Sequence, residues 1–162
     1  GRDDQTLAEG LLEAGEHHLL LVSQSRPALS RALVCVTSGE PGKDDVLFAG
    51  RLMRHLGAEA TLLSVLPEGE DLELNRDRTE RFLTSGVRSL DVLGVPARTI
   101  IRTGPVSAEI NTELESGNYD FLILGSPLAD RDGRVTLTGV VGQLLNKVAD
   151  LPILIVRSTL PD

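Results

Sequence analysis

The sequence predicts an α/β fold, a doubly wound five-stranded parallel sheet with helices on both faces. Short aliphatic runs alternate with longer amphipathic segments along most of the 162 residues, and the connections between them are short. Such runs are typical of parallel strands that are buried on both faces. Right-handed crossovers between these strands then place helices on both faces of the sheet. A chain of this length fits one domain with a sizeable core.

The first strand–helix–strand unit is predicted from its aliphatic runs and from helix end signals. Residues 32–38 (ALVCVTS) and 60–67 (ATLLSVLP) are expected to form the first two strands. Between them, residues 43–57 carry apolar side chains at helical spacing, acids in the first turn, basic residues late and a glycine at the end. This combination indicates a helix.

The middle of the chain contains a second amphipathic pattern at residues 75–93, which predicts a helix. The acidic run EGEDLELNRDRTE at 68–80 is expected to be a mobile, solvated connection, with a partner-docking segment as the alternative. Residues 97–104 (ARTIIRTG) predict a third strand. Its short, polar composition suits a strand at the edge of the sheet.

The last elements have clear boundaries. Residues 105–117 begin with proline and end with glycine, the asymmetry expected of a helix. Residues 121–126 (FLILGS) predict the fourth strand, residues 139–149 the last helix, and residues 152–158 (PILIVRS) the last strand. The last predicted element is therefore a strand that contains four consecutive aliphatic residues.

Composition and charge exclude several classes of function. The formal net charge of −8 argues against nucleic acid or an anionic membrane surface as a partner, because no basic field attracts phosphates. The single cysteine, Cys35, excludes an internal disulfide and fits a reducing compartment. It lies in an aliphatic run and is expected to be a small buried residue. No signal peptide or membrane span is visible.

Residues 1–30 are predicted to form a helix–strand arm that precedes the domain of residues 31–162. Residues 7–27 and 141–161 share a Leu-Leu pair, a polar break, a four-residue aliphatic run (LLLV, ILIV) and a proline five residues after that run. This weak self-similarity indicates either the end of a preceding, similar unit or a decorating arm, and the sequence does not choose between them.

Ligands in such a sheet bind beyond the carboxyl ends of the strands, at the point where the strand order reverses. The loops expected there are 37–43, 66–69, 103–105 and 125–139. The last of these, LGSPLADRDGRVTLTG with its flanks, joins a strand to a helix through a glycine-containing loop. This arrangement is one by which proteins hold phosphates.

Four segments, in this order and spacing, resemble the universal stress protein family. They are RALVCVTSGEPGKDDVLFAGRLMRHLGAEATLLSV, RTGPVSAEI, NYDFLILGS and TGVVGQLLNKVADLPILIVR. The resemblance spans residues 31–158. It implies a Rossmann-like five-stranded parallel sheet, a dimer that pairs through the last strands and, in many members, a site for ATP or AMP.

The nucleotide-binding members carry an acid after the first strand and a G-x2-G-x9-G-[ST] pattern after the fourth. Here Thr37 stands at the position of the acid, Leu128 at that of the second glycine and Val140 at that of the hydroxyl. Gly125 and Gly139 match the first and last glycines, although the loop between them is one residue longer. A side chain at position 128 would crowd a phosphate, and valine offers no hydrogen bond.

The resemblance implies a set of candidate nucleotide-binding residues, with arginine and hydroxyl side chains as substitutes for the lost motif. They are Thr37, Ser38, Val65, Gly104, Gly125, Ser126, Arg134, Gly139, Val140 and Val141. The loop also contains aspartates that offset its arginines, so local ion pairs on a solvated loop are the plainer interpretation. No catalytic residue and no metal site is predicted.

The resemblance, together with the altered motif, therefore implies a non-enzymatic, cytoplasmic regulatory module of stress response without tight ATP binding. It could equally be the cytosolic part of a larger or membrane protein. The alternatives are an adenine-nucleotide sensor with a variant phosphate loop and an enzyme of the wider nucleotide-hydrolase superfamily. Pairing, as a homodimer or with a preceding repeat, is expected through the last strand and through residues 17–23 (HHLLLVS). The pairing residues of the last strand are Ile153, Leu154, Ile155 and Val156.

Overall fold

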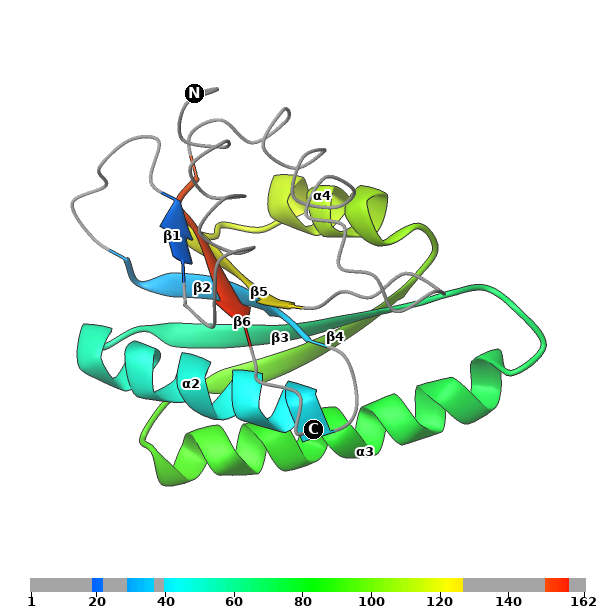
Figure 1. Cartoon of the computed structure of the whole chain (residues 1–162), viewed down its shortest axis with the longest axis horizontal. Coiled ribbons are helices and arrows are strands. Elements are labelled where there is room, and N and C mark those ends of the chain that lie inside the picture. The colour runs from blue at the N-terminus through cyan, green and yellow to red at the C-terminus, as the bar shows by residue number, and fades with distance from the viewer. Residues whose placement is uncertain (1–18, 22–28, 37–39, 127–150, 158–162) are drawn as a thin grey trace.

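The computed structural model describes residues 19–21, 29–36, 40–126 and 151–157, which build a six-stranded sheet in the order β1-β6-β5-β2-β3-β4 (Figure 1). Strands β2 to β6 are mutually parallel, and β1 pairs antiparallel with β6. The five parallel strands are those that the sequence predicted. The strands are β1 (Leu19–Leu21), β2 (Arg31–Cys35), β3 (Glu59–Leu66), β4 (Ala97–Thr103), β5 (Phe121–Ser126) and β6 (Ile153–Arg157).

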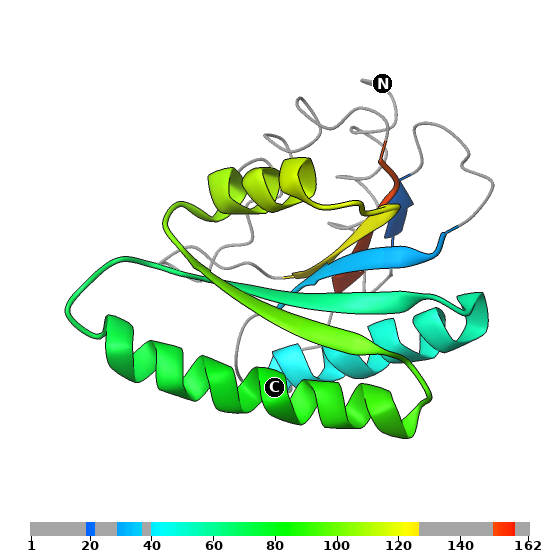
Figure 2. The same ribbon diagram turned by 180° about the vertical axis from the view of Figure 1, so that it is seen from behind.

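Helices cover both faces of the sheet, as predicted. Helices α2 (Glu40–Leu56) and α3 (Leu72–Val92) lie on one face, and α4 (Val106–Ser116) lies on the other (Figures 1 and 2). The helix expected at residues 139–149 lies outside the described residues, as does the helix expected in the arm.

The core consists of two apolar layers, one on each face of the sheet. Alternate residues of β2 show the division: Ala32 and Val34 belong to the layer under α2 and α3, whereas Leu33 and Cys35 belong to the layer under α4. All four are at most 3% exposed. Burial on both faces explains why the strands read as continuous aliphatic runs rather than as alternating patterns.

The prediction of a solvated connection at residues 68–80 was wrong, because α3 begins at Leu72. The buried residues of α3 recur at helical spacing, and they already include Thr79 within the acidic run. Most of the charged side chains of that run are exposed on the opposite side of the helix. The charges therefore marked an exposed helix face, and the connection itself is only the short segment 67–71.

The two edges of the sheet are formed by β4 and by β1. The edge position that the sequence predicted for residues 97–104 is confirmed. At the other end of the sheet, β1 pairs Leu19 with Ile155, Leu20 with Leu154 and Leu21 with Ile153. The strand expected in the arm thus lies beside the last strand of the same chain.

Candidate functional site

The carboxyl ends of the parallel strands meet at one edge of the sheet, and the strand order reverses between β2 and β5. From β2 the chain builds β3 and then β4 on one side, and it returns to add β5 and β6 on the other. The last paired residues at this reversal are Cys35 and Leu124. An open α/β sheet binds ligands in the crevice just beyond such a point.

The end of β2 is fixed by two hydrogen bonds from β3. The Val36 N–H donates to the carbonyl of Leu63 over 2.9 Å, and the Ser64 hydroxyl donates to the carbonyl of Val36 over 2.7 Å. Together they set the direction of the chain one residue before Thr37. Thr37 and Ser38 themselves lie outside the described residues. Sequence reasoning missed Ser64, whose signal is a lone hydroxyl within an aliphatic strand.

Val65 and Gly104 lie on neighbouring strands at this edge. Val65 is half-buried and packs against the apolar layer under α4. The Gly104 N–H donates to the carbonyl of Leu66 over 3.0 Å, and its φ of +139° suits glycine. A Cβ at position 104 would also lie 2.8 Å from Glu109 Oε1. Backbone conformation and close approach to α4 therefore explain this glycine without a ligand.

Gly125 and Ser126 are the last two residues of β5, on the other side of the reversal. Their backbones pair with Val156 and Arg157 of β6. Parallel strands are about 4.8 Å apart, so β5 and β3 flank β2 with roughly 10 Å between them. The structure thus brings four of the ten candidate residues to one edge. The other candidates lie outside the described residues, namely Thr37, Ser38, Arg134, Gly139, Val140 and Val141, as does Leu128.

A partly buried polar cluster joins β4 to α4 next to this edge. Arg102 donates through Nε and Nη2 to Glu113 Oε1, at 3.1 and 3.0 Å, and through Nη1 to Glu109 Oε2 at 3.3 Å. The Tyr119 hydroxyl donates to Glu113 Oε2 over 2.8 Å. Both oxygens of Glu113, a side chain that is 8% exposed, are therefore satisfied.

The second arginine of β4 extends the same cluster toward β3. Arg98 donates through Nε to Thr61 Oγ1 at 3.0 Å and through Nη2 to the Tyr119 hydroxyl at 3.4 Å. The sequence carried a signal for the cluster, since the two arginines are four residues apart on one strand face and Glu109 and Glu113 are four apart on one helix. Because Arg102 already binds two carboxylates, the cluster holds α4 to β4 rather than offering a phosphate site.

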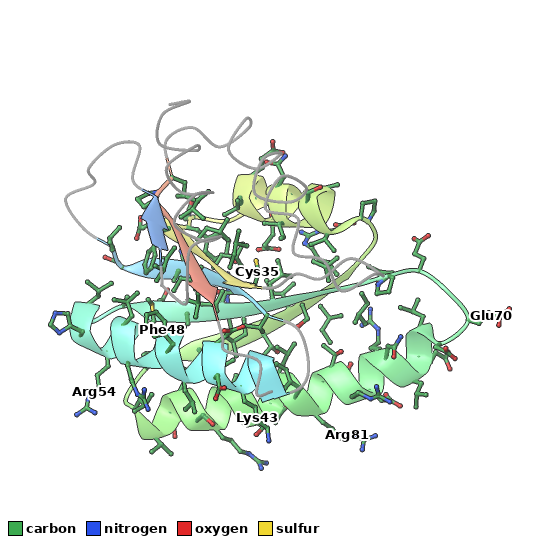
Figure 3. All side chains as sticks on the ribbon, in the orientation of Figure 1. Cys35, Lys43, Phe48, Arg54, Glu70 and Arg81 are labelled. Carbon is green, nitrogen blue, oxygen red and sulfur yellow. The ribbon has the colours of Figure 1, made fainter. Side chains whose placement is uncertain are left out.

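The titratable groups beside this cluster are held in their neutral forms. Burial, and then the charge of Glu113, raise the pKa of the Cys35 thiol. Burial and the hydrogen bond with Glu113 raise the pKa of Tyr119. Figure 3 shows Cys35 inside the molecule, whereas Arg81 extends outward from α3. A buried thiol of raised pKa is a packing residue, as the sequence predicted, and not a nucleophile.

Asp45 of α2 is a buried carboxyl group on the opposite face. It is 4% exposed, and its Oδ1 is the one buried side-chain N or O atom of the described residues without a hydrogen-bond partner. Burial, and then the charge of Asp44, raise its pKa to about 7. The sequence showed only a pair of acids near a helix start, which did not reveal that one of them is buried.

Other kinds of site find no support in the described part of the chain. Among residues 19–21, 29–36, 40–126 and 151–157, no three His, Cys, Asp or Glu side chains gather where they could hold a metal ion. The helices described there are too short or too polar to cross a membrane. A hollow of about 480 Å³ lies at the amino-terminal edge, lined among others by Arg31, Arg54 and Glu59. It lies away from the strand reversal.

A scan against protein-family models and a search of curated proteins find no match to this sequence. Solved structures do match. A universal stress protein in complex with cAMP has a TM-score of 0.62 and 16% identity, over 82% of this chain and 99% of the other. A universal stress protein family protein from Arabidopsis thaliana with AMP bound has a TM-score of 0.58 and 16% identity, over 80% and 92%.

A longer structure matches more of this chain. A universal stress protein from Archaeoglobus fulgidus DSM 4304 has a TM-score of 0.64 and 17% identity, over 93% of this chain and 53% of the other. This chain therefore spans about half the length of that protein. At these identities the likeness establishes architecture rather than activity. The sheet order, the helices on both faces and these matches agree with the resemblance seen in the sequence: the chain has the fold of the universal stress proteins.

Proposed function

We propose that this chain is a regulatory module of the universal stress protein type, which acts by binding and pairing rather than by catalysis. The observation that carries the proposal is the fold, a β4-β3-β2-β5-β6 parallel sheet that matches universal stress proteins over about four fifths of the chain or more. Two further features support it. The buried thiol of Cys35 and the fully paired Arg102 cluster are suited to structure, not to turnover.

An adenine nucleotide is the second candidate, favoured by the cAMP and AMP found in two of the matching structures. Two features at the edge where it would bind support this candidate, namely Gly125 at the end of β5 and the end of β2 held by Ser64. The side chains expected to bind it are altered at positions 37, 128 and 140. We therefore expect no tight ATP binding.

The test is calorimetric titration of ATP, AMP and cAMP, with magnesium, into the purified protein. The preparation is first checked for copurified nucleotide. The matched variant Thr37→Asp/Leu128→Gly/Val140→Ser restores the side chains of the family pattern. We expect no heat from the natural chain and saturable heat from the restored variant. Saturable binding to the natural chain that Gly139→Arg abolishes would favour the nucleotide sensor, and ATP turnover would favour an enzyme.

Pairing through β6, with a second copy or within a longer chain, is part of the same proposal. The net charge of −8 disfavours nucleic acid as the partner. The aliphatic side chains of β6 are buried where the structure describes them, at Ile153, Leu154 and Val156. In the structure β1 covers the side of β6 that faces away from β5, so pairing through β6 requires that β1 be displaced.

A further inference from the structure

The charged side chains of α3 are divided by sign between two lines along the helix. Positions 73, 77, 80, 84, 87 and 91 carry four acids and no basic residue, whereas positions 74, 78, 81, 85, 88 and 92 carry three arginines and no acid. Steps of four and three residues alternate in both sets, so each set follows one line on the helix surface. The second set, the arginine stripe, consists of Leu74, Arg78, Arg81, Ser85, Arg88 and Val92.

The arginine stripe faces solvent. All six of its residues are exposed, and the residues by which α3 packs on the sheet, among them Leu83 and Leu90, lie on the other side of the helix. Figure 3 shows Arg81 extending away from the molecule. The stripe begins with Leu74 and ends with Val92, which are 59% and 86% exposed, the highest values among the large hydrophobic residues that the structure describes. The stripe is therefore basic in its middle and apolar at both ends.

The arginines of the stripe have no ion-pair partner within the described part of the chain. The ion pairs found there involve Arg31 and Arg102 instead. Asp77 stands four residues before Arg81, a spacing at which an ion pair can form, yet the structure forms none. The guanidinium groups are thus available to carboxylates from outside the chain, which arginine binds through two parallel hydrogen bonds.

The charge of the rest of the chain restricts the partner to a short one. Helix α3 carries four arginines and four acids, so the formal net charge of −8 comes entirely from the other residues. Exposed charges interact over about 8 Å at physiological salt, so a segment lying on the stripe is affected mainly by the stripe itself. A long polyanion such as a nucleic acid would also meet the acidic remainder of the surface.

The shape of the stripe suits a helix as partner. The stripe runs straight for about 27 Å, the length of the helix from residue 74 to residue 92. Its alternating steps of four and three residues are those of the seam by which two helices pack along each other. Two apolar side chains at the ends are too few for insertion into a membrane interface, which requires a broad apolar face.

We propose that the arginine stripe of α3 is the docking surface for an acidic amphipathic helix of a partner protein. Carboxylates of that helix bind Arg78, Arg81 and Arg88, and an apolar residue near each of its ends covers Leu74 or Val92. This surface is separate from the strand reversal and from β6. The proposal therefore depends neither on nucleotide binding nor on pairing through the last strand.

A synthetic helical peptide serves as the probe for the direct test. It carries glutamate at alternating steps of four and three residues, with a leucine at each end, and the control peptide carries glutamine in place of every glutamate. Fluorescence anisotropy of each labelled peptide is measured as the full natural chain is added at about 50 mM salt. We expect saturable binding of the glutamate peptide, at least about tenfold tighter than that of the glutamine peptide. Equal affinities, or no saturation by the glutamate peptide, would overturn the proposal.

Paired substitutions locate the binding surface. Arg81→Gln/Arg88→Gln should weaken binding of the glutamate peptide about tenfold. Arg51→Gln/Arg54→Gln is the matched control, because it removes two exposed arginines from the neighbouring α2 and changes the net charge equally. It should change the affinity less than about twofold, and an equal weakening by both variants would show general attraction instead of docking. All four positions are exposed, so the variants keep the fold.

Two further measurements test the apolar ends and the class of partner. Leu74→Ser/Val92→Ser should weaken binding of the glutamate peptide about threefold, because both side chains become covered in the complex. An unchanged affinity would contradict docking along the whole stripe. Vesicles of phosphatidylcholine and phosphatidylserine and a DNA duplex are the competing probes. Tighter binding of either one than of the glutamate peptide would overturn the choice of an acidic helix.

Discussion

Two buried carboxyl groups lie on opposite faces of the sheet, and their surroundings differ. Glu113 of α4 receives hydrogen bonds from Arg102 and from the Tyr119 hydroxyl. Asp45 of α2 has one oxygen without any partner. Burial removes both groups from water, but only Glu113 regains equivalent interactions. The carboxyl group on the α4 face is therefore held by hydrogen bonds, whereas burial on the α2 face raises the pKa of Asp45 to about 7.

The largest effect should come from Glu113→Ala. The variant leaves the Tyr119 hydroxyl without its acceptor and Arg102 with Glu109 alone, and we expect it to lose about 3 kcal/mol of unfolding free energy. Urea denaturation followed by circular dichroism measures this loss. Glu109→Ala is the matched control and should cost less than about 1 kcal/mol, because that pair is partly exposed. Equal losses of unfolding free energy would show that the Arg102–Glu113 pair contributes no more to stability than the more exposed Arg102–Glu109 pair.

Asp45→Asn should increase the unfolding free energy at high pH, whereas Glu113→Ala lowers it. The pKa of Asp45 is raised from 3.8 to about 7, so the folded state holds a proton that the unfolded state releases between these values. Stability from this group is therefore full below about pH 4 and is lost as the pH rises to about 7. We expect the variant to remove this decline and to gain on the order of 2 kcal/mol at pH 8.

The control for this prediction is Asp44→Asn, because Asp44 is the exposed neighbour. It should change the slope of stability against pH only slightly, by relieving the charge that Asp44 places beside Asp45. Unfolding free energies measured by urea denaturation from pH 4 to pH 8 give both slopes. An Asp45→Asn variant with the same slope of stability against pH as the natural chain would contradict the raised pKa.

Substitution of a neutral polar residue should change the stability less than substitution of either buried carboxyl group. Ser64→Ala removes the 2.7 Å hydrogen bond to the Val36 carbonyl, and we expect a loss of about 1–2 kcal/mol. Ser89→Ala, which removes an exposed bond to the Ser85 carbonyl, should cost less than about 0.5 kcal/mol. Thermal unfolding of the two variants side by side measures the difference. A larger loss from Ser89→Ala would show that the end of β2 is not held by Ser64.

Sequence reasoning predicted the sheet well because both faces of each parallel strand are buried. The runs FLILGS and ALVCVTS carry that burial in their own composition, without reference to any partner. The same reasoning missed the Glu113 cluster, whose members come from three separate elements and meet only in the folded chain. It also missed the start of α3, because charge marked residues 72–80 as exposed and exposure was taken for lack of structure.

The site could be predicted only in part, for the same physical reason. Gly104 and Gly125 lie at the carboxyl ends of β4 and β5, as expected for glycines that close an aliphatic run, and their binding of a ligand stays a prediction. The Ser64 hydroxyl and the buried Asp45 carboxyl depend on contacts between elements, which spacing alone does not reveal. The antiparallel pairing of β1 with β6 joins residues that are far apart in the sequence. Self-similarity suggested that these segments are alike, and only the structure pairs them.

Native mass spectrometry of the full chain, as purified, tests most directly the claim that this is a module of the universal stress protein type without tight nucleotide binding. We predict that no species carries the added mass of an adenine nucleotide. A mass increased by that of an adenine nucleotide would contradict the loss of the phosphate site at positions 37, 128 and 140.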